Sequence, residues 1–386
     1  MDILILVASL AVILLGCELF TNGIEWIGNK LNLGEGVVGS VLAAVGTAMP
    51  ETLIPIIAIF FSGASSEQVA HEIGIGAILG APFMLATLAM FVTGTAILIF
   101  TRTGRRTSQM NVNPVVLGRD MTFFFIAYTI AFGVAFLPQD GFFQPQGVVR
   151  WVVAASLIVL YAVYVLRQFS DETEIGDDLN PLHIARFFRS LARKIGLTPA
   201  SGMATPVVEA HTAVDVQSMD EISPILRTPP SLMVTIFQAT AGLALIIVGA
   251  RMFVDSVDHL GHAIGIAPLI LALLIAPVAT ELPEKFNSVL WVRRGKDTLA
   301  MGNITGAMVF QSCIPTAIGI ALTGWTFSAT PESTYAFISA PVALISAGII
   351  FGVMRLRGNL TAKWLLFGGA WYAAFLVFII TRSIGG

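Results

Sequence analysis

The sequence predicts an all-α integral membrane protein with ten transmembrane helices, arranged as two inverted five-helix repeats with broken helices at the centre. Three observations predict this fold. The 386 residues are 56% hydrophobic and only 12% charged, the basic residues gather in alternate connections, and the second half repeats a pattern of the first. A soluble protein of this length needs more charged residues to cover its surface.

Ten stretches are long and apolar enough to cross a bilayer, which takes about 20 residues in a helix. They lie at roughly 3–24, 37–61, 75–100, 120–138, 149–168, 231–254, 264–291, 300–323, 334–354 and 363–382. We therefore expect one five-span repeat in residues 1–168, a linker in 169–230 and a second five-span repeat in 231–386.

Basic residues predict the orientation of these spans. If the spans alternate in direction, one side of the membrane receives 17 of the 21 Lys and Arg residues. Cytoplasmic connections are enriched in Lys and Arg. We expect a protein of the cell (plasma or inner) membrane with both termini outside and the central loop in the cytoplasm.

The two halves match without a gap at an offset of 233 positions. This offset pairs Gly16 with Gly249, Phe20 with Phe253, Asn22 with Asp255, Gly28 with Gly261, Thr47 with Thr280, Pro50 with Pro283 and Glu51 with Glu284. The next similar pair, GAILG at 76–80 and GNITG at 302–306, needs an offset of 226, so the second copy has a shorter loop. An odd number of spans per copy inserts the second copy upside down, as in inverted-repeat transporters.

A proline followed by a glutamate interrupts one span in each half. Pro50 has no N–H for the carbonyl of Gly46, and Pro283 has none for that of Ala279, so two carbonyls are released near mid-membrane. Free carbonyls are tolerated there only where they line a cavity or bind something. We expect both prolines to break their helices and expose these oxygens.

The acids that follow the prolines complete an oxygen-rich site. Glu51 and Glu284 supply two carboxylates, and Thr47 and Thr280 supply hydroxyls. Calcium takes six to eight oxygen ligands in irregular geometry. The alternative is that the prolines are ordinary kinks and the acids pair for packing, but a charge at the bilayer centre costs about 2.5–3.5 kcal/mol or more and usually serves function.

The motifs resemble those of a known family. VGTAMPE with ILGAPF (within 39–94), and VATELPE with GNITGAMVF (within 272–323), resemble the two alpha-repeats of the calcium:cation antiporter superfamily, sodium/calcium exchangers in particular. The resemblance implies ion-binding roles for Glu51 and Glu284, and ligating roles for Thr47 and Thr280. It also implies that the first and sixth spans slide to alternate access.

Several residues depart from the family pattern. Where the family has serine after the threonine, this chain has Ala48 and Glu281; polar ligands are also missing at 80–82 and 306–308. Lys285 stands beside Glu284 and four residues after Glu281, so that Glu281 and Lys285 share a face if the helix continues. Our hypothesis is that these two pair, with the alternative that Lys285 turns toward Glu284. Candidate replacement ligands are Asn303, Asn287, Ser288 and Gln311.

The linker from 169 to 230 contains the segment LHIARFFRSLARK at 182–194, which predicts a basic amphipathic helix on the anionic inner leaflet. No nucleotide-binding loop is present in the sequence. We expect no cofactor, no nucleotide and no nucleic acid as partners, only membrane lipid and transported inorganic cations.

The predicted function is secondary active antiport of a divalent cation, Ca²⁺ first, for Na⁺, by a transporter that is not an enzyme. The alternatives are an exchanger coupled to H⁺ or one for another metal such as Mg²⁺ or Mn²⁺. A cation channel or sensor on the same fold is a further alternative.

Overall fold

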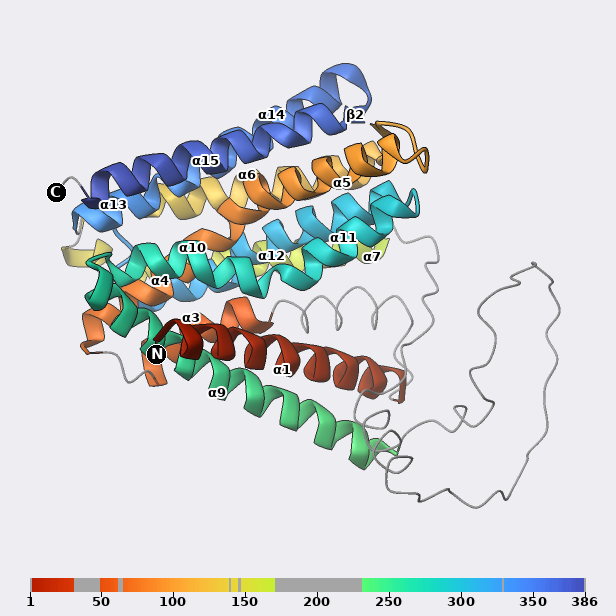
Figure 1. Ribbon diagram of the computed structural model, residues 1–386. Helices are drawn as coiled ribbons and strands as arrows, with labels where there is room; N and C mark the ends of the chain where they lie inside the picture. The colour runs from red at the N-terminus through yellow and green to blue at the C-terminus, as the bar shows by residue number, and fades with distance from the viewer. Residues whose placement is uncertain are drawn as a thin grey trace, which may run out of the picture.

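The computed structural model of the chain is a bundle of α-helices (Figure 1). It describes residues 2–30, 49–61, 65–138, 140–144, 147–170, 231–327 and 330–384. The first half contains α1 (Asp2–Lys30), α3 (Met49–Phe61), α4 (Glu67–Met84), the π-helical turn η2 (Leu85–Ala89), α5 (Met90–Arg102), β1 (Gln109–Met110), α6 (Pro114–Val134), the 3₁₀ turn η3 (Gly141–Phe143) and α7 (Val148–Ser170). The second half contains α9 (Leu232–Ile264), α10 (Pro268–Thr280), α11 (Leu282–Arg293), α12 (Asp297–Leu322), α13 (Pro331–Phe337), α14 (Ser339–Arg357), β2 (Leu360–Thr361) and α15 (Ala362–Ile384).

Within the described residues, eight helical segments are long and apolar enough to cross a membrane. Two shorter apolar helices, Glu51–Phe61 and Pro268–Val278, stand where the second and seventh spans are expected. Residues 37–48 of the expected second span lie outside the described part, and the seventh is divided between α10 and α11. The prediction of a helical membrane protein is confirmed.

Local sequence signals fix the helix ends. Asn113 caps α6, its side chain accepting from the Val115 N–H at 2.9 Å, and Pro114 follows as the first helical residue, where its missing N–H costs nothing. Ser231 caps α9 in the same way. At the other end of α9, Gly265 takes a left-handed conformation with φ of 70°, which glycine adopts without strain.

Helices α1 and α9 lie side by side and antiparallel along most of their length (Figure 1). Glycines allow the close approach: a Cβ on Gly16 would lie 2.8 Å from the carbonyl oxygen of Gly242, and one on Gly242 would lie 2.6 Å from the backbone nitrogen of Phe20. About two turns further along α9, a Cβ on Gly249 would lie 3.0 Å from the carbonyl oxygen of Ser9. Small residues of this kind are typical of helix contacts within membranes.

The α1–α9 pair meets the rest of the protein through a hydrophobic cluster of its own. Residues of α1 and α9 pack there with α3, α4 and α10, among them Ile13, Ile54, Ile73, Phe253 and Ala272. A second and larger cluster fills the space between the remaining helices. The pair therefore forms a layer beside the main bundle, as Figure 1 shows.

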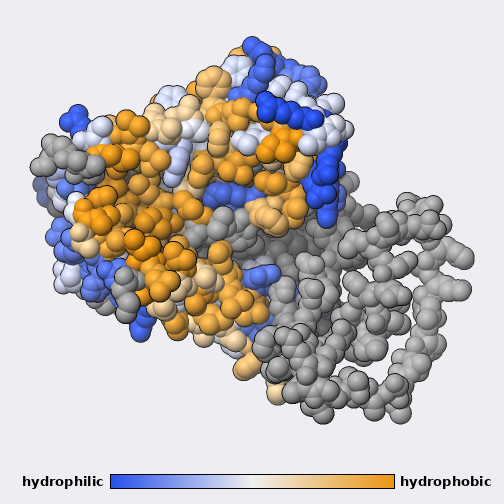
Figure 2. Space-filling model, in the orientation of Figure 1, coloured by the Kyte–Doolittle hydropathy of each residue, from blue (hydrophilic) through white to orange (hydrophobic). Residues whose placement is uncertain are grey.

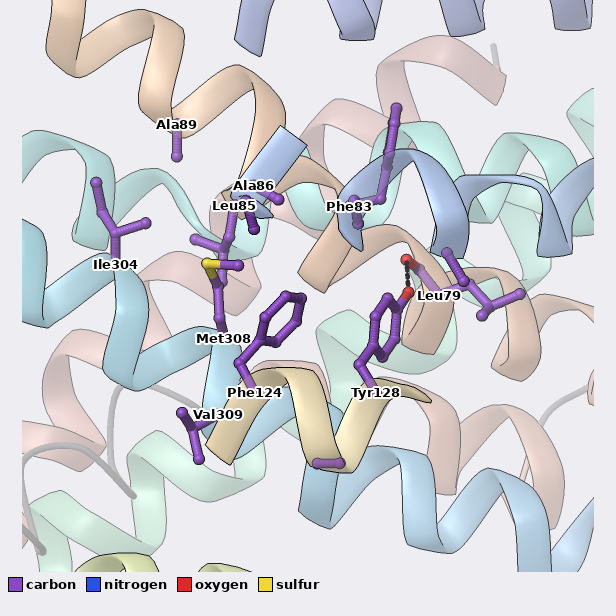
Figure 3. Packing of buried hydrophobic residues seen from close by; sticks show 14 of the residues in the cluster. Leu79, Phe83, Leu85, Ala86, Ala89, Phe124, Tyr128, Ile304, Met308 and Val309 are labelled. Atoms are coloured by element: carbon purple, nitrogen blue, oxygen red, sulfur yellow. Dashed lines mark hydrogen bonds between the residues drawn. The ribbon is translucent and has the colours of Figure 1, made fainter. Parts of the chain in front are cut away.

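In the larger cluster, α4, α6 and α12 interdigitate, as seen in Figure 3. Phe124 and Tyr128 of α6 stack with ring centroids 5.3 Å apart, and the Tyr128 hydroxyl donates to the carbonyl of Leu79 at 3.4 Å. Pro82 lies inside α4, three residues before the π-helical turn η2. Proline removes one helical hydrogen bond, and a π-turn accommodates the resulting irregularity in the helix.

A short sheet and an ion pair join distant segments at one end of the bundle. β1 pairs antiparallel with β2, and Arg106 makes two contacts with the carboxylate of Asp297, at 2.7 Å and 2.9 Å. Hydrophilic residues gather toward the end that holds β2, and much of the face in view is apolar (Figure 2). Both chain ends lie at the opposite end of the bundle (Figure 1).

Candidate ion-binding site

The candidate site begins at the break between α10 and α11. α10 ends at Thr280 and α11 begins at Leu282, which leaves Glu281 in the capping position with φ of −85° and ψ of 3°. Pro277 and Pro283 flank the break and have no N–H to donate. Proline in the first turn of α11 costs nothing there, but Pro277 inside α10 leaves a carbonyl of that helix without its usual donor. The seventh expected span is thus divided into two helices at Glu281.

Glu281 is fully buried at this break. Its Oε1 atom accepts a hydrogen bond from the side-chain amide of Gln311 on α12. Its Oε2 atom and the Oε1 atom of Gln311 have no hydrogen-bond partner among the described residues. Two buried acceptor oxygens, one of them on a carboxylate, are thus left without donors, and such oxygens are suitable ligands for a hard cation.

Lys285 reaches the same break from the first turn of α11. Its side chain is buried, with 7% exposed, and Nζ donates to the carbonyl of Pro277 at 3.3 Å. The ammonium of Lys285 thus binds the end of α10, and its pairing with Glu281 stays a prediction.

Helix α4 packs directly against the break. A Cβ on Gly80 would lie 2.7 Å from Cγ of Pro277, and closer still to the carbonyl oxygen of Leu273. One turn earlier in α4, a Cβ on Gly76 would likewise clash with the carbonyl oxygen of Leu269. Any larger residue at Gly80 would push the two helices apart, so the glycine of the ILGAPF motif allows the third and seventh expected spans to meet.

In the first half, Glu51 lies in the first turn of α3 and is buried, with 6% exposed. The amide groups at a helix N-terminus favour a carboxylate at this position. α3 packs against α12, the helix that carries Gln311, as well as against α4 and α10. The acid of the first repeat therefore stands on a helix that borders the elements around Glu281.

The other predicted ligands are placed as follows. Thr280 is buried, and its hydroxyl donates to the carbonyl of Ala276 at 3.1 Å, which leaves the oxygen lone pairs available as acceptors. Asn303 donates to the Ser288 hydroxyl at 3.3 Å and lies about 12 Å along α12 from Gln311, at 1.5 Å per residue. Asn303 therefore binds α11 to α12 at some distance from the Glu281 carboxylate.

Part of the predicted set lies outside the described residues. This holds for all atoms of Gly46 and Thr47, and for the side chains of Pro50, Ala279, Pro283, Glu284 and Asn287. Among the residues that the structure describes, there is no group of three or more His, Cys, Asp or Glu side chains that would hold a metal ion by themselves.

Gln311 is one of the four replacement ligands predicted from the sequence, and no sequence feature distinguishes it from the other three. Only the packing of α12 against the break shows that it binds Glu281. No pattern in the sequence indicated another buried acid, Asp120 on α6. Its carboxylate accepts from the Thr305 hydroxyl at 2.6 Å and from the Tyr164 hydroxyl at 3.1 Å.

Comparison with known proteins decides the family. The profile of the family described as "Sodium/calcium exchanger protein" matches residues 1–170 and 234–381. The chain belongs to this family. The resemblance noted in the alpha-repeat motifs is therefore confirmed, and the chain is a membrane transporter rather than an enzyme.

Individual relatives of this exchanger-family chain are distant. "Sodium/calcium exchanger MaX1" of Methanosarcina acetivorans is 23% identical over 382 residues, which cover 97% of each chain. "Putative antiporter CaxA" of Alkalimonas amylolytica is 26% identical over 148 residues, 38% of this chain and only 46% of that relative.

Two solved structures share the fold. The H⁺/Ca²⁺ exchanger CAX superposes with a TM-score of 0.64 at 13% identity, covering 98% of this chain and 82% of the other. The sodium-calcium exchanger NCX_Mj superposes with a TM-score of 0.53 at 17% identity, covering 98% of this chain and 99% of the other.

Proposed function

We propose that the protein is a secondary active antiporter that exchanges a divalent cation, Ca²⁺ first, for Na⁺ by alternating access. Glu51 and Glu284 bind the ion from opposite repeats near the membrane centre. The other proposed ligands are the side chains of Thr47, Thr280, Glu281 and Asn303 and the carbonyls of Gly46 and Ala279. The observation that carries the proposal is the buried Glu281–Gln311 pair, whose two acceptor oxygens lack donors at the break in the seventh span.

Two inverted repeats are part of the proposal. The contacts between α1 and α9 support it, because residues equivalent at the offset of 233 occupy equivalent places. Gly16 lies against Gly242. The residues equivalent to these two are Gly249 and Ser9, and they also lie against each other. Such reciprocal contacts are expected of two helices related by a two-fold axis. With α3 and the α10–α11 pair counted as broken spans, the chain has ten.

Alternating access requires one group of helices to move against another. The α1–α9 pair is the proposed moving part, because it packs mainly on α3, α4 and α10 and has its own hydrophobic cluster. Its surface contact with the bundle borders the elements of the site. Sliding of the pair would thus open the site to one side and close it to the other.

The proposed orientation places the termini outside and the 169–230 linker in the cytoplasm, with its basic segment at 182–194 on the inner leaflet. The basic residues Arg106, Arg357 and Lys363 support this, because they accompany β1 and β2 at the end of the bundle opposite to the chain termini (Figure 1).

The test is ion uptake into proteoliposomes that contain the purified full-length protein. Initial ⁴⁵Ca²⁺ uptake is measured with an outward gradient of Na⁺, then of H⁺, and then with none. An exchanger coupled to Na⁺ takes up Ca²⁺ only when the outward Na⁺ gradient is present, because Na⁺ leaving the vesicle drives Ca²⁺ entry. Uptake that follows the H⁺ gradient selects the H⁺-coupled alternative, and competition by Mg²⁺ or Mn²⁺ measures metal selectivity. Uptake without any opposing gradient, down the Ca²⁺ gradient alone, identifies a channel and overturns the proposal.

A further inference from the structure

Lys285 occupies a position at which an ion would be expected. The carbonyl of Pro277 accepts both from Nζ of Lys285 at 3.3 Å and from the backbone N–H of Glu281 at 3.2 Å. A side chain on a helix leans toward the helix N-terminus. A lysine in the first turn of α11 therefore extends back across the break to the last turn of α10, whose carbonyls carry partial negative charge.

The surroundings keep this ammonium inside the protein. Lys285 is 7% exposed, and Glu281, one helical turn before it, is fully buried. Gln311 binds only one of the two carboxylate oxygens of Glu281. The Pro277 carbonyl at the break thus binds a cation that belongs to the chain, one helical turn after the buried Glu281.

We propose that the Lys285 ammonium is a fixed cation of the ion site, which sets the charge of the empty site at −2 and makes the exchange electroneutral. The inference rests on the proposed function, in which Glu51 and Glu284 bind the transported ion. The site then holds three carboxylates and one ammonium, from Glu51, Glu281, Glu284 and Lys285. Their net charge of −2 is neutralised by one divalent cation or by two monovalent cations.

Burial explains why the balance matters. An uncompensated charge near the bilayer centre is costly. The protein therefore changes between its outward-open and inward-open states most easily when the bound cations cancel the charge of the site. With Lys285 present, one bound divalent cation or two bound monovalent cations leave the site neutral. Without Lys285, the site has a charge of −3, and one divalent cation no longer neutralises it.

The first experiment measures transport stoichiometry. Initial ⁴⁵Ca²⁺ uptake into proteoliposomes is recorded while a K⁺ gradient with valinomycin sets the membrane potential, using whichever coupling ion the gradient assay identifies. For the unaltered protein we expect uptake that does not vary with potential and a Hill coefficient of about 2 for the coupling ion. Lys285→Met should make uptake depend on potential, with a Hill coefficient of about 3. Potential-dependent uptake by the unaltered protein would overturn the inference.

The second experiment does not depend on transport and so separates this inference from the proposed function. Binding of La³⁺ and Ca²⁺ to the purified protein is measured by calorimetry. A site with one more negative charge favours the trivalent ion, so Lys285→Met should raise the ratio of La³⁺ to Ca²⁺ affinity at least tenfold. Glu281→Gln combined with Lys285→Met restores the charge of −2 and should bring the ratio back. Lys296→Met, at an exposed lysine, is the matched control.

A La³⁺ to Ca²⁺ ratio that is the same in Lys285→Met and in Lys296→Met would show that Lys285 only braces the helix break. A double variant no different from Lys285→Met would do the same. If the gradient assay finds no exchange while the affinity ratio shifts as expected, the proposed function fails and the fixed cation stands.

Discussion

Gln311 of α12 donates a side-chain hydrogen bond to Oε1 of Glu281, the residue at which the seventh expected span breaks. The two residues are 30 positions apart, and both are buried. The contact ties the irregular backbone between α10 and α11 to a regular helix. The position of the buried carboxylate is thereby set by α12 as well as by its own turn.

Replacing Gln311 with leucine should weaken both the fold and ion binding. The change removes the hydrogen-bond donor to the Glu281 carboxylate and also an acceptor oxygen, and a hydrogen bond to a charged group contributes about 1.5–3 kcal/mol. We expect a lower unfolding temperature in detergent and a smaller rise of that temperature on adding Ca²⁺. Ser312→Ala is the control, because the Ser312 hydroxyl donates to the carbonyl of Val309 in its own helix. An equal Ca²⁺-dependent rise in both variants would exclude Gln311 from the site.

Glu51→Gln and Glu284→Gln should each abolish divalent cation transport while expression and thermal stability stay near normal. Glutamine keeps the volume of the side chain and removes the charge that the cation needs. The measurement is gradient-driven ⁴⁵Ca²⁺ uptake, with Glu67→Gln at an exposed position of α4 as the control. Exchange retained at unchanged Ca²⁺ affinity in either variant would contradict a site shared by the two repeats.

Valine at Gly16 or Gly242 should separate α1 from α9. The added Cβ would lie 2.8 Å or less from the backbone of the facing helix, which cannot move aside without shifting the whole pair. Overpacking of this kind costs about 1–3 kcal/mol. We expect a lower unfolding temperature and slower exchange than for Gly352→Val, where a Cβ would meet nothing within 4 Å. Equal behaviour of the three variants would mean that the close approach of the pair has no role.

Asp297→Asn should destabilise the end of the bundle that holds the short sheet. Asp297 is 4% exposed, and besides Arg106 it accepts the backbone N–H of Asn111 at 2.8 Å. Removing one partner of a buried ion pair costs about 3–5 kcal/mol because the other charge is left uncompensated. The unfolding temperature should fall well below that of Arg105→Gln, a change at an exposed neighbouring residue. A fall that disappears at high salt would indicate a solvent-screened pair instead.

The sequence by itself determined the class of the protein and most of its helices. Long apolar stretches and scarce charges require membrane helices whatever their partners are, because the bilayer leaves no other way to satisfy the backbone. Pro283 likewise predicts a break in the seventh expected span, since the missing N–H is a property of the residue itself. The motifs around Glu51 and Glu284 were enough to indicate the family.

Only the tertiary structure decided which side chains meet. The pairing of Glu281 with Gln311, the ion pair of Arg106 with Asp297 and the antiparallel β1–β2 contact all join segments that are far apart in the chain. No local signal encodes them, because they arise from the way in which helices pack. The i, i+4 spacing of Glu281 and Lys285 predicted a pair on a continuous helix, whereas in the structure the Lys285 ammonium donates across the break to the Pro277 carbonyl. Spacing gives the neighbours on a regular helix, but where the helix ends, the surrounding helices determine where a side chain goes.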